Sequence, residues 1–375
     1  MNRDKFIILI ILVIGLGVRF YLAKGSYNFD IVATQQDVEI FRQGKNIYLH
    51  QTAYNYSPYF YYMAGFFGLV QDILPFLEIK FIARAFYSFI DIITFFVIYK
   101  IATQHKLSAI KTAGLFFLNP VSIIISGHHG QFDNIAIFFL LLAVYFAGKN
   151  KIKNKMKGKI IWSLLTIGLI VKHIIAFQVL FFFVLFTKKK IVAISLFGLS
   201  IVVFLLTLLP FVPASGGQIV NRVFLYGGVE GLYGMTYFLG NIFSGSIFAG
   251  PGLYLVYKMI FLIGYLLFVM LIRPKDIARG ILLSILFFLT FTSGIGAQYF
   301  MLPIAFGAFF PTRWFYLYTL AVTLFFLGSV DELNIYTFKV FEWNTVWLFT
   351  IFWLISELVA SIEPLNKLHR KLAIM

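Results

Sequence analysis

The chain has 375 residues, of which 61% are hydrophobic and only 12% are charged, a composition that excludes an ordinary soluble domain and predicts an integral membrane protein. It contains no cysteine, which excludes disulfides, thiolate metal sites and cysteine nucleophiles. The formal net charge of +16 does not indicate nucleic acid as a partner, because membrane proteins concentrate Lys and Arg in their cytoplasmic loops.

The first predicted element is an apolar span at about 6–23, which we expect to be retained as a signal anchor because it lacks a small-residue cleavage site. Clusters of Lys and Arg follow along the chain. If all of them are cytoplasmic, an even number of crossings separates each cluster from the next, and both termini are cytoplasmic. The apolar segments that fit this rule are 80–101, 111–126, 134–148, 191–211, 252–272, 280–293, 299–311, 314–330 and 344–362.

The apolar segment 58–75 does not fit, because a crossing there would turn every later loop to the other side of the membrane. We therefore expect an interfacial or re-entrant helix within a long first outer loop, 25–79. The tyrosines near the start of the segment suit the headgroup region of a bilayer.

The segment 159–187 carries Lys172 and His173 at its middle. A single helix would place the lysine near the bilayer centre, at about +3 kcal/mol on insertion scales. We expect two short helices instead, 159–171 and 174–187, which meet at Lys172 below the outer surface, inside the protein or a wet cavity.

The expected fold class is therefore an all-α polytopic membrane protein with about 12 transmembrane or half-crossing helices, in one integral membrane domain over 1–375. The stretch SGHHGQFDN at 126–134 points to a site, because polar groups persist at a membrane only where water, a partner or a substrate meets them. The outer loops of this topology are 25–79, 126–134, the Lys172–His173 tip, 212–251, 293–299 and 331–343.

Asp30 is the candidate general base. It leads a helical segment that ends near Gly44, and Asp37 lies two turns further along the same face, about 10 Å away at 1.5 Å per residue. A low-dielectric wall beside Asp30 would raise the pKa of its carboxyl towards that of a useful base. The alternatives are that Asp30 caps the helix, and that Asp37 and Glu39 lie on a solvated face.

His128, His129, Lys172 and Arg222 are candidates for contacting an anionic or polar ligand. The histidines lack the i, i+4 spacing of helical zinc sites, so we expect a hydrogen-bonding or acid–base role, or histidines satisfied within their loop. The ammonium of Lys172 needs an anionic partner, either a carboxylate of this chain or a ligand phosphate. A carboxylate near cations suits transfer from a lipid-linked phosphate donor.

The order of short motifs along the chain resembles the GT-C superfamily of polytopic glycosyltransferases, which use polyprenyl-phosphate sugars. The resemblance covers most of the chain, although Tyr-Ser-Pro stands where the family usually has Tyr-Pro-Pro. The motifs are FDIVATQQD with Asp30, GKNIY at 44–48, YSP at 56–58, NPVSIIISGHHGQFDN at 119–134, GLIVKHIIAF at 168–177 and AQYFMLP at 297–303.

The resemblance implies an inverting transfer of a hexose or pentose, with a mannose-like sugar favoured, from polyprenyl phosphate to a lipid- or glycan-linked hydroxyl on the extracytoplasmic face. Asp30 would be the base, with Asp37 as its competitor, and no metal and no cofactor would be needed. Separately from the resemblance, the composition rich in lysine, isoleucine and phenylalanine and the compact loops predict that the protein lies among the lipids of a prokaryotic inner membrane. The substrate-binding residues would come from Asp37, His128, His129, Gln131, Asp133, Lys172, His173, Arg222, Gln298 and Tyr299.

The main alternative is a polytopic transporter or a flippase of lipid-linked glycans. Asp91, Lys172 and Glu357 would then lie along a translocation path. Otherwise we expect Asp91 and Glu357 to be structural, paired with Arg84 or with each other.

Overall fold

The structure is a computed structural model that describes residues 3–149, 152–187, 189–226, 228–242, 251–274, 276–329 and 333–361, with the side chains of 229–230 and 251–254 left out. Parts of the expected outer loops 212–251 and 331–343 therefore lie outside the described residues. The chain divides into two compact units, each described by itself below. Unit 1 comprises Met1–Val179 and Ile191–Tyr226, and unit 2 comprises Leu180–Lys190 and Gly227–Met375. A single integral membrane domain stays a prediction.

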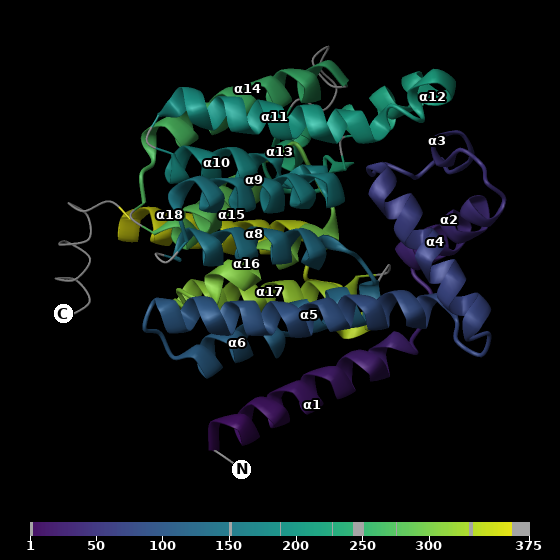
Figure 1. The fold of residues 1–375 in the computed structure, drawn as a ribbon, viewed down its shortest axis with the longest axis horizontal. Coiled ribbons are helices and arrows are strands. Elements are labelled where there is room, and N and C mark those ends of the chain that lie inside the picture. The colour runs from purple at the N-terminus through teal and green to yellow at the C-terminus, as the bar shows by residue number, and fades with distance from the viewer. Residues whose placement is uncertain are drawn as a thin grey trace. The chain divides into compact units, whose positions relative to one another are not determined.

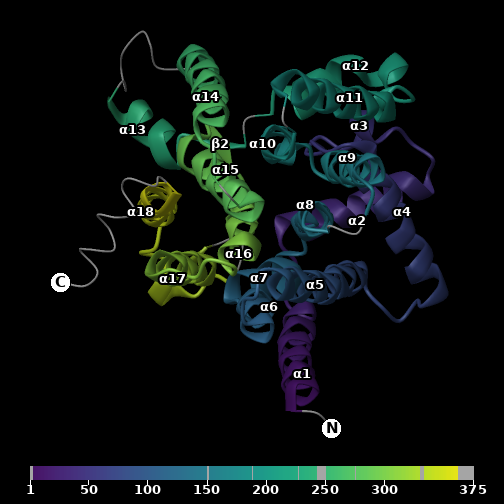
Figure 2. The same cartoon turned by 60° about the vertical axis from the view of Figure 1, so that its left-hand side comes forward.

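Unit 1 is a set of apolar helices with a cluster of shorter helices at one end (Figures 1 and 2). Helix α8 packs against both α5 and α9, and α1 and α6 pack against α5. The elements of this unit are α1 (Arg3–Ala23), α2 (Phe29–Arg42), α3 (Ile47–His50), α4 (Pro58–Ile73), α5 (Ile79–Gln104), α6 (Ala109–Phe117), α7 (Pro120–Ile124), the π-helical turn η1 (Ile125–His129), α8 (Asp133–Ala147), α9 (Asn154–Val171), the 3-10 turn η2 (His173–Ile175), the start of α10 (Ala176–Phe186), α11 (Lys190–Leu208), α12 (Val212–Ile219) and the π-helical turn η3 (Val220–Phe224).

The segment 25–79, expected to be a long outer loop that contains helices, is mostly helical, and Figure 1 shows its helices α2, α3 and α4 together at one end of α5. The expected helix at 58–75 is α4, which packs on α2 and begins with Ser57 as its N-cap. Helix α2 ends in the hydrogen-bond pattern of a Schellman motif, in which Gly44 has a φ of +62°. These caps set the lengths of the loop helices.

The helix break expected at Lys172 is confirmed. Helix α9 ends at Val171, Lys172 adopts extended φ/ψ angles of −143° and 101°, and a 3-10 turn leads into α10. Because the residue has left the helix, its side chain can turn towards the preceding helices instead of lying on the α9 surface.

Unit 2 is built around α15, whose residues are buried on most of its faces. Helices α14, α16 and α18 pack against it, and the two-residue strands β1 and β2 pair antiparallel. The elements are β1 (Val229–Glu230), α13 (Gly234–Ile242), α14 (Pro251–Leu271), α15 (Ile277–Phe291), β2 (Gly294–Ile295), the 3-10 turn η4 (Ala297–Met301), α16 (Leu302–Gly307), α17 (Arg313–Gly328), the 3-10 turn η5 (Tyr336–Phe338) and α18 (Trp343–Ser361).

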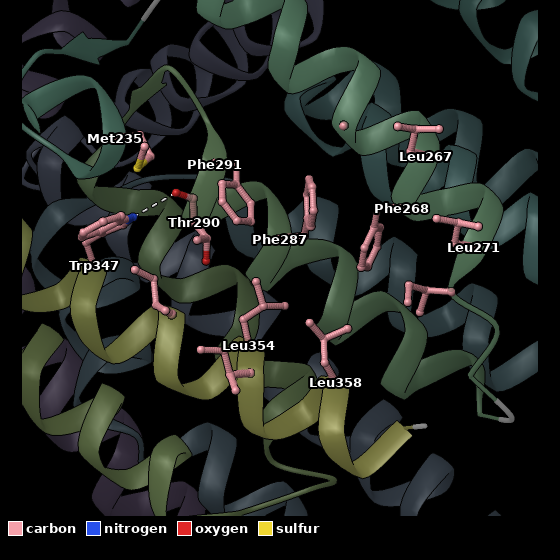
Figure 3. Close-up of a pocket in the computed structure, with 14 residues that line it drawn as sticks. Met235, Leu267, Phe268, Leu271, Phe287, Thr290, Phe291, Trp347, Leu354 and Leu358 are labelled. Carbon is pink, nitrogen blue, oxygen red and sulfur yellow. Dashed lines mark hydrogen bonds between the residues drawn. The ribbon is translucent and has the colours of Figure 1, made fainter. Parts of the chain in front are cut away.

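Unit 2 also contains an apolar groove of about 600 Å³ between α13, α14, α15 and α18 (Figure 3). Leucine and phenylalanine side chains dominate its wall, and the indole N–H of Trp347 donates to the backbone oxygen of Thr290 at 2.9 Å. The described residues that line the groove are apolar except Thr290 and Trp347, and none of them is ionisable.

The described residues form an all-α structure in which several apolar helices could span a membrane. Among them, α1, α5, α11 and α18 are long and apolar enough to cross a bilayer, and α6 with α7–η1, bent by 47°, would be a fifth span if the pair crosses as one. Five shorter apolar helices accompany them. The expected number of about 12 crossings goes beyond these candidates and stays a prediction.

Two buried carboxylates in the apolar helices form ion pairs that differ from those expected. Asp91 pairs with Arg19 of α1 at 3.2 Å, and Glu357 pairs with Arg279 of α15 at 3.6 Å. Arg84 instead donates to backbone oxygens of the segment that joins α1 to α2. The expected pairing of either carboxylate with Arg84 is therefore wrong.

Candidate functional site

The start of α2 meets the π-helical turn η1. The Asn28 side chain caps α2 by accepting from the backbone N–H of Ile31 at 2.9 Å, and its amide donates to the backbone oxygen of His129 at 3.0 Å. Asp30 follows in the first turn, and its Oδ2 lies 2.7 Å from Nε2 of His129. The capping role considered for Asp30 is therefore wrong, since Asn28 performs it and leaves the Asp30 carboxylate to face the imidazole.

The environment of Asp30 lowers the pKa of its carboxyl. Burial acts to raise that pKa, but the charge and hydrogen bond of His129, the charge of Lys172 and a hydrogen bond from Gln131 outweigh it. The expected rise of the Asp30 pKa is therefore wrong. The Asp30 side chain is 22% exposed. At neutral pH the site thus presents an ionised carboxylate that a ligand hydroxyl can reach.

The polar segment 126–134, expected to be a loop, is instead a π-helical turn followed by the first residues of α8. The N–H of Gly130 donates to the oxygen of Ile125 at 2.9 Å and ends the turn with a φ of +77°. Single π-helical turns are frequent at functional sites. Here the turn places His128 beside Gly25 and His129 beside Asp30.

Lys172 has a carboxylate of this chain as its partner. Its Nζ lies 3.0 Å from Oδ2 of Asp133, and both side chains are almost fully buried. The ammonium also lies over the rings of Tyr56, at 4.6 Å, and Phe132, at 4.4 Å. Asp133, expected to bind substrate, therefore neutralises Lys172. The positive charge of Lys172 also helps to lower the pKa of Asp30.

Gln131 joins the two groups of charges. Its side chain is buried, its amide donates to the Tyr56 hydroxyl at 3.3 Å, and it also hydrogen-bonds Asp30. Gln131, His129, Lys172 and Asp30 are thus brought together as expected. Tyr56, which sequence reasoning had placed only in the YSP motif, belongs with them.

Asp37 lies apart from the imidazole although it shares α2 with Asp30. Its side chain is 2% exposed, and burial raises the pKa of its carboxyl to about 7, against a smaller lowering by Gln51. The solvated position considered for Asp37 is therefore wrong, whereas Glu39 is exposed and pairs with Arg42 at 2.7 Å. Of the two candidate bases, Asp30 is the one that a ligand can reach.

The remaining candidates lie elsewhere. Arg222 donates to the backbone oxygens of Tyr48, at 2.8 Å, and Gln51, at 2.7 Å, so it anchors α3. His173 starts the turn η2, and its ring lies 6.1 Å from that of Phe204. Gln298 and Tyr299 belong to η4 of unit 2, and their part in the site stays a prediction.

Within the described residues, no group of three or more His, Asp and Glu side chains lies close enough together to hold a metal ion. Metal independence stays a prediction. Comparison of the chain with protein-family models and with curated proteins finds no match in either.

Proposed function

We propose that this chain is an inverting glycosyltransferase that moves a hexose or pentose, with a mannose-like sugar favoured, from a polyprenyl-phosphate donor to an acceptor hydroxyl on the extracytoplasmic side. The observation that carries the proposal is the reachable Asp30 carboxylate held 2.7 Å from the His129 imidazole. A base that takes a proton from a hydroxyl must be within hydrogen-bond reach of it, and the exposed part of Asp30 allows that approach.

In the proposed reaction, Asp30 takes the proton of the acceptor hydroxyl as its oxygen attacks the anomeric carbon. The bond from that carbon to the phosphate oxygen breaks, and polyprenyl phosphate leaves with the bonding electrons. His129, when protonated, would balance the charge of Asp30 before the transfer and of the phosphate after it. Lys172 supplies a fixed positive charge next to the site. Asp133 pairs with this ammonium and so offsets the cost of burying it in the protein interior.

The proposed topology has about 12 crossings or half-crossings, both termini in the cytoplasm and α2–α4 on the outer face of a prokaryotic inner membrane. The lipid or glycan that carries the acceptor hydroxyl would approach the end of the helices where α2 meets η1. Four or five candidate spans among the described residues support a membrane protein of this class.

The test is a transfer assay with the full chain in nanodiscs, supplied with radiolabelled polyprenyl-phosphate sugars and membrane lipid extract. Asp30→Asn should fold and lose about 10²–10⁴-fold in rate, the range of a general base. Asp72→Asn is the matched control, because Asp72 is an exposed carboxylate of the same loop, paired with Arg42. Near-normal transfer by Asp30→Asn would reject the assigned base. Binding of the lipid without transfer from any donor would favour the flippase.

A further inference from the structure

Arg19 in α1 and Asp91 in α5 form a buried ion pair within unit 1. Both side chains are 0% exposed and lie 3.2 Å apart between apolar helices. Removing two charges from water is costly, and replacing such pairs by apolar residues is often neutral or stabilising. Stability alone therefore does not explain why this chain carries the pair.

Arg19 holds the segment that leads into η1. Its Nε donates to Oγ of Ser126 at 3.0 Å, and its Nη2 donates to Oγ of Ser122 at 2.9 Å. Its Nη1 donates to the backbone oxygen of Phe117 at 2.8 Å. A Cβ at Gly127 would lie 2.9 Å from the Arg19 Cα, so the backbones of α1 and η1 touch and only glycine fits there.

Asp91 holds the other end of the same segment. Its Oδ1 accepts from Nδ2 of Asn134 at 3.1 Å, and the same amide donates to the backbone oxygen of Tyr87 at 2.7 Å. Asn134 is the second residue of α8, so these bonds fix where that helix begins. One ion pair therefore holds both Ser126 and Asn134, the first and last polar residues of the segment 126–134.

His129 lies between these two attachment points. We propose that Arg19 and Asp91 are positioning residues, which place the His129 imidazole against Asp30 by holding both ends of the polar segment 126–134. The placement follows from the hydrogen bonds around the pair and does not require that the site transfer glycosyl groups.

The pKa of the Asp30 carboxyl depends on how close the His129 imidazole lies to it. Burial raises it, and the opposing effects of His129, Lys172 and Gln131 bring it below its ordinary value. Among the described residues, the charge of Asp30 also acts on the hydroxyls of two tyrosines, Tyr87 of α5 and Tyr226 at the end of unit 1. If the imidazole moves away, the pKa of Asp30 rises, and His129→Gln shows the full size of that rise.

The experiment follows the carboxyl carbon of Asp30 by NMR in the full chain, labelled with ¹³C-aspartate in nanodiscs and assigned through Asp30→Asn. Arg19→Leu combined with Asp91→Leu should raise the pKa of Asp30 by about 1 unit or more, towards the value in His129→Gln. The matched control is Arg279→Leu combined with Glu357→Leu, which removes the ion pair between α15 and α18 and should leave the Asp30 titration unchanged.

Two single variants test the proposal without removing a charge. Ser126→Ala breaks one attachment and Asn134→Ala the other, and each should raise the pKa of Asp30 by less than the double leucine variant does. These variants decide the question if the double variant does not fold. A wild-type Asp30 titration in the folded double variant, or in both single variants, would overturn the proposal, as would an equal rise in the control pair.

Discussion

Asp37→Asn is expected to stabilise the protein above neutral pH. The Asp37 carboxyl is 2% exposed, and its Oδ1 has no hydrogen-bond partner within the described part of the chain. An ionised carboxylate in such a place has lost its hydrogen bonds to water, and the protein does not replace all of them. The folded state therefore favours the protonated form. An asparagine of nearly the same shape carries no charge and avoids that loss.

The magnitude follows from the two pKa values. Burial raises the pKa of Asp37 from 3.8 to about 7, which is about 3 units and, at 1.36 kcal/mol per unit, about 4 kcal/mol. Because the folded pKa is the higher one, the folded state binds more protons between these values. The free energy of unfolding therefore falls as pH rises from about 4 to 7, and the full loss of about 4 kcal/mol is present above pH 7.

The assay is equilibrium unfolding in mixed micelles, followed by tryptophan fluorescence, at several pH values between 4 and 8. Asp37→Asn should gain stability over the wild type as pH rises and reach most of the difference by pH 8. Glu39→Gln, an exposed carboxylate on the same helix, is the matched control and should keep the wild-type pH dependence. A difference between Asp37→Asn and wild type that does not change with pH would refute the reasoning.

Two further substitutions test the packing of the site by the same unfolding assay. Lys172→Met should cost about 3–5 kcal/mol because it leaves Asp133 buried and unpaired, and Lys172→Met combined with Asp133→Leu should recover most of that loss. A double variant no more stable than the single one would contradict this. Gly127→Ala should cost about 1–3 kcal/mol, since its Cβ meets the backbone of Arg19. Gly17→Ala should be neutral or slightly stabilising, because no described residue lies within 4 Å of the Cβ it adds. Equal effects of the two alanines would show that the contact at Gly127 is relaxed at little cost.

The positions of the apolar helices were predictable because each is a long apolar run that ends in polar residues. The run predicted at 80–101 corresponds to α5, and the run at 344–362 corresponds to α18. The break at Lys172 was predictable for the same reason, since a charge at the middle of such a run opposes a continuous helix. Within the loop 25–79, the helices that begin near Asp30 and at 58 were predictable as well, whereas the short helix α3 was not predicted.

The members of the site were predictable, but their partners were not. Asp30, Gln131 and Lys172 stand out because each is polar beside an apolar run. The pairing of Lys172 with Asp133 depends on which helices are neighbours, and sequence spacing carries no such information. The pKa of Asp30 likewise depends on His129, which lies far away in the sequence, so its direction could not be derived from residues close to it in the sequence.

The π-helical turn η1 has a consequence for how this region can change in length. A π-helical turn accommodates one residue more than an α-helical turn, so removing one residue from 125–129 would let the segment close into a regular α-helix. Because the wider turn absorbs its extra residue locally, such a deletion would leave the direction of the flanking segments nearly unchanged, but it would shift the side chains within the turn, which follow one another at about 100° per residue in an α-helix. The spacing between the Ser126 hydroxyl and the His129 ring is thus a matter of residue count as well as residue type. A shortened chain could keep all its polar side chains and still direct the imidazole away from α2.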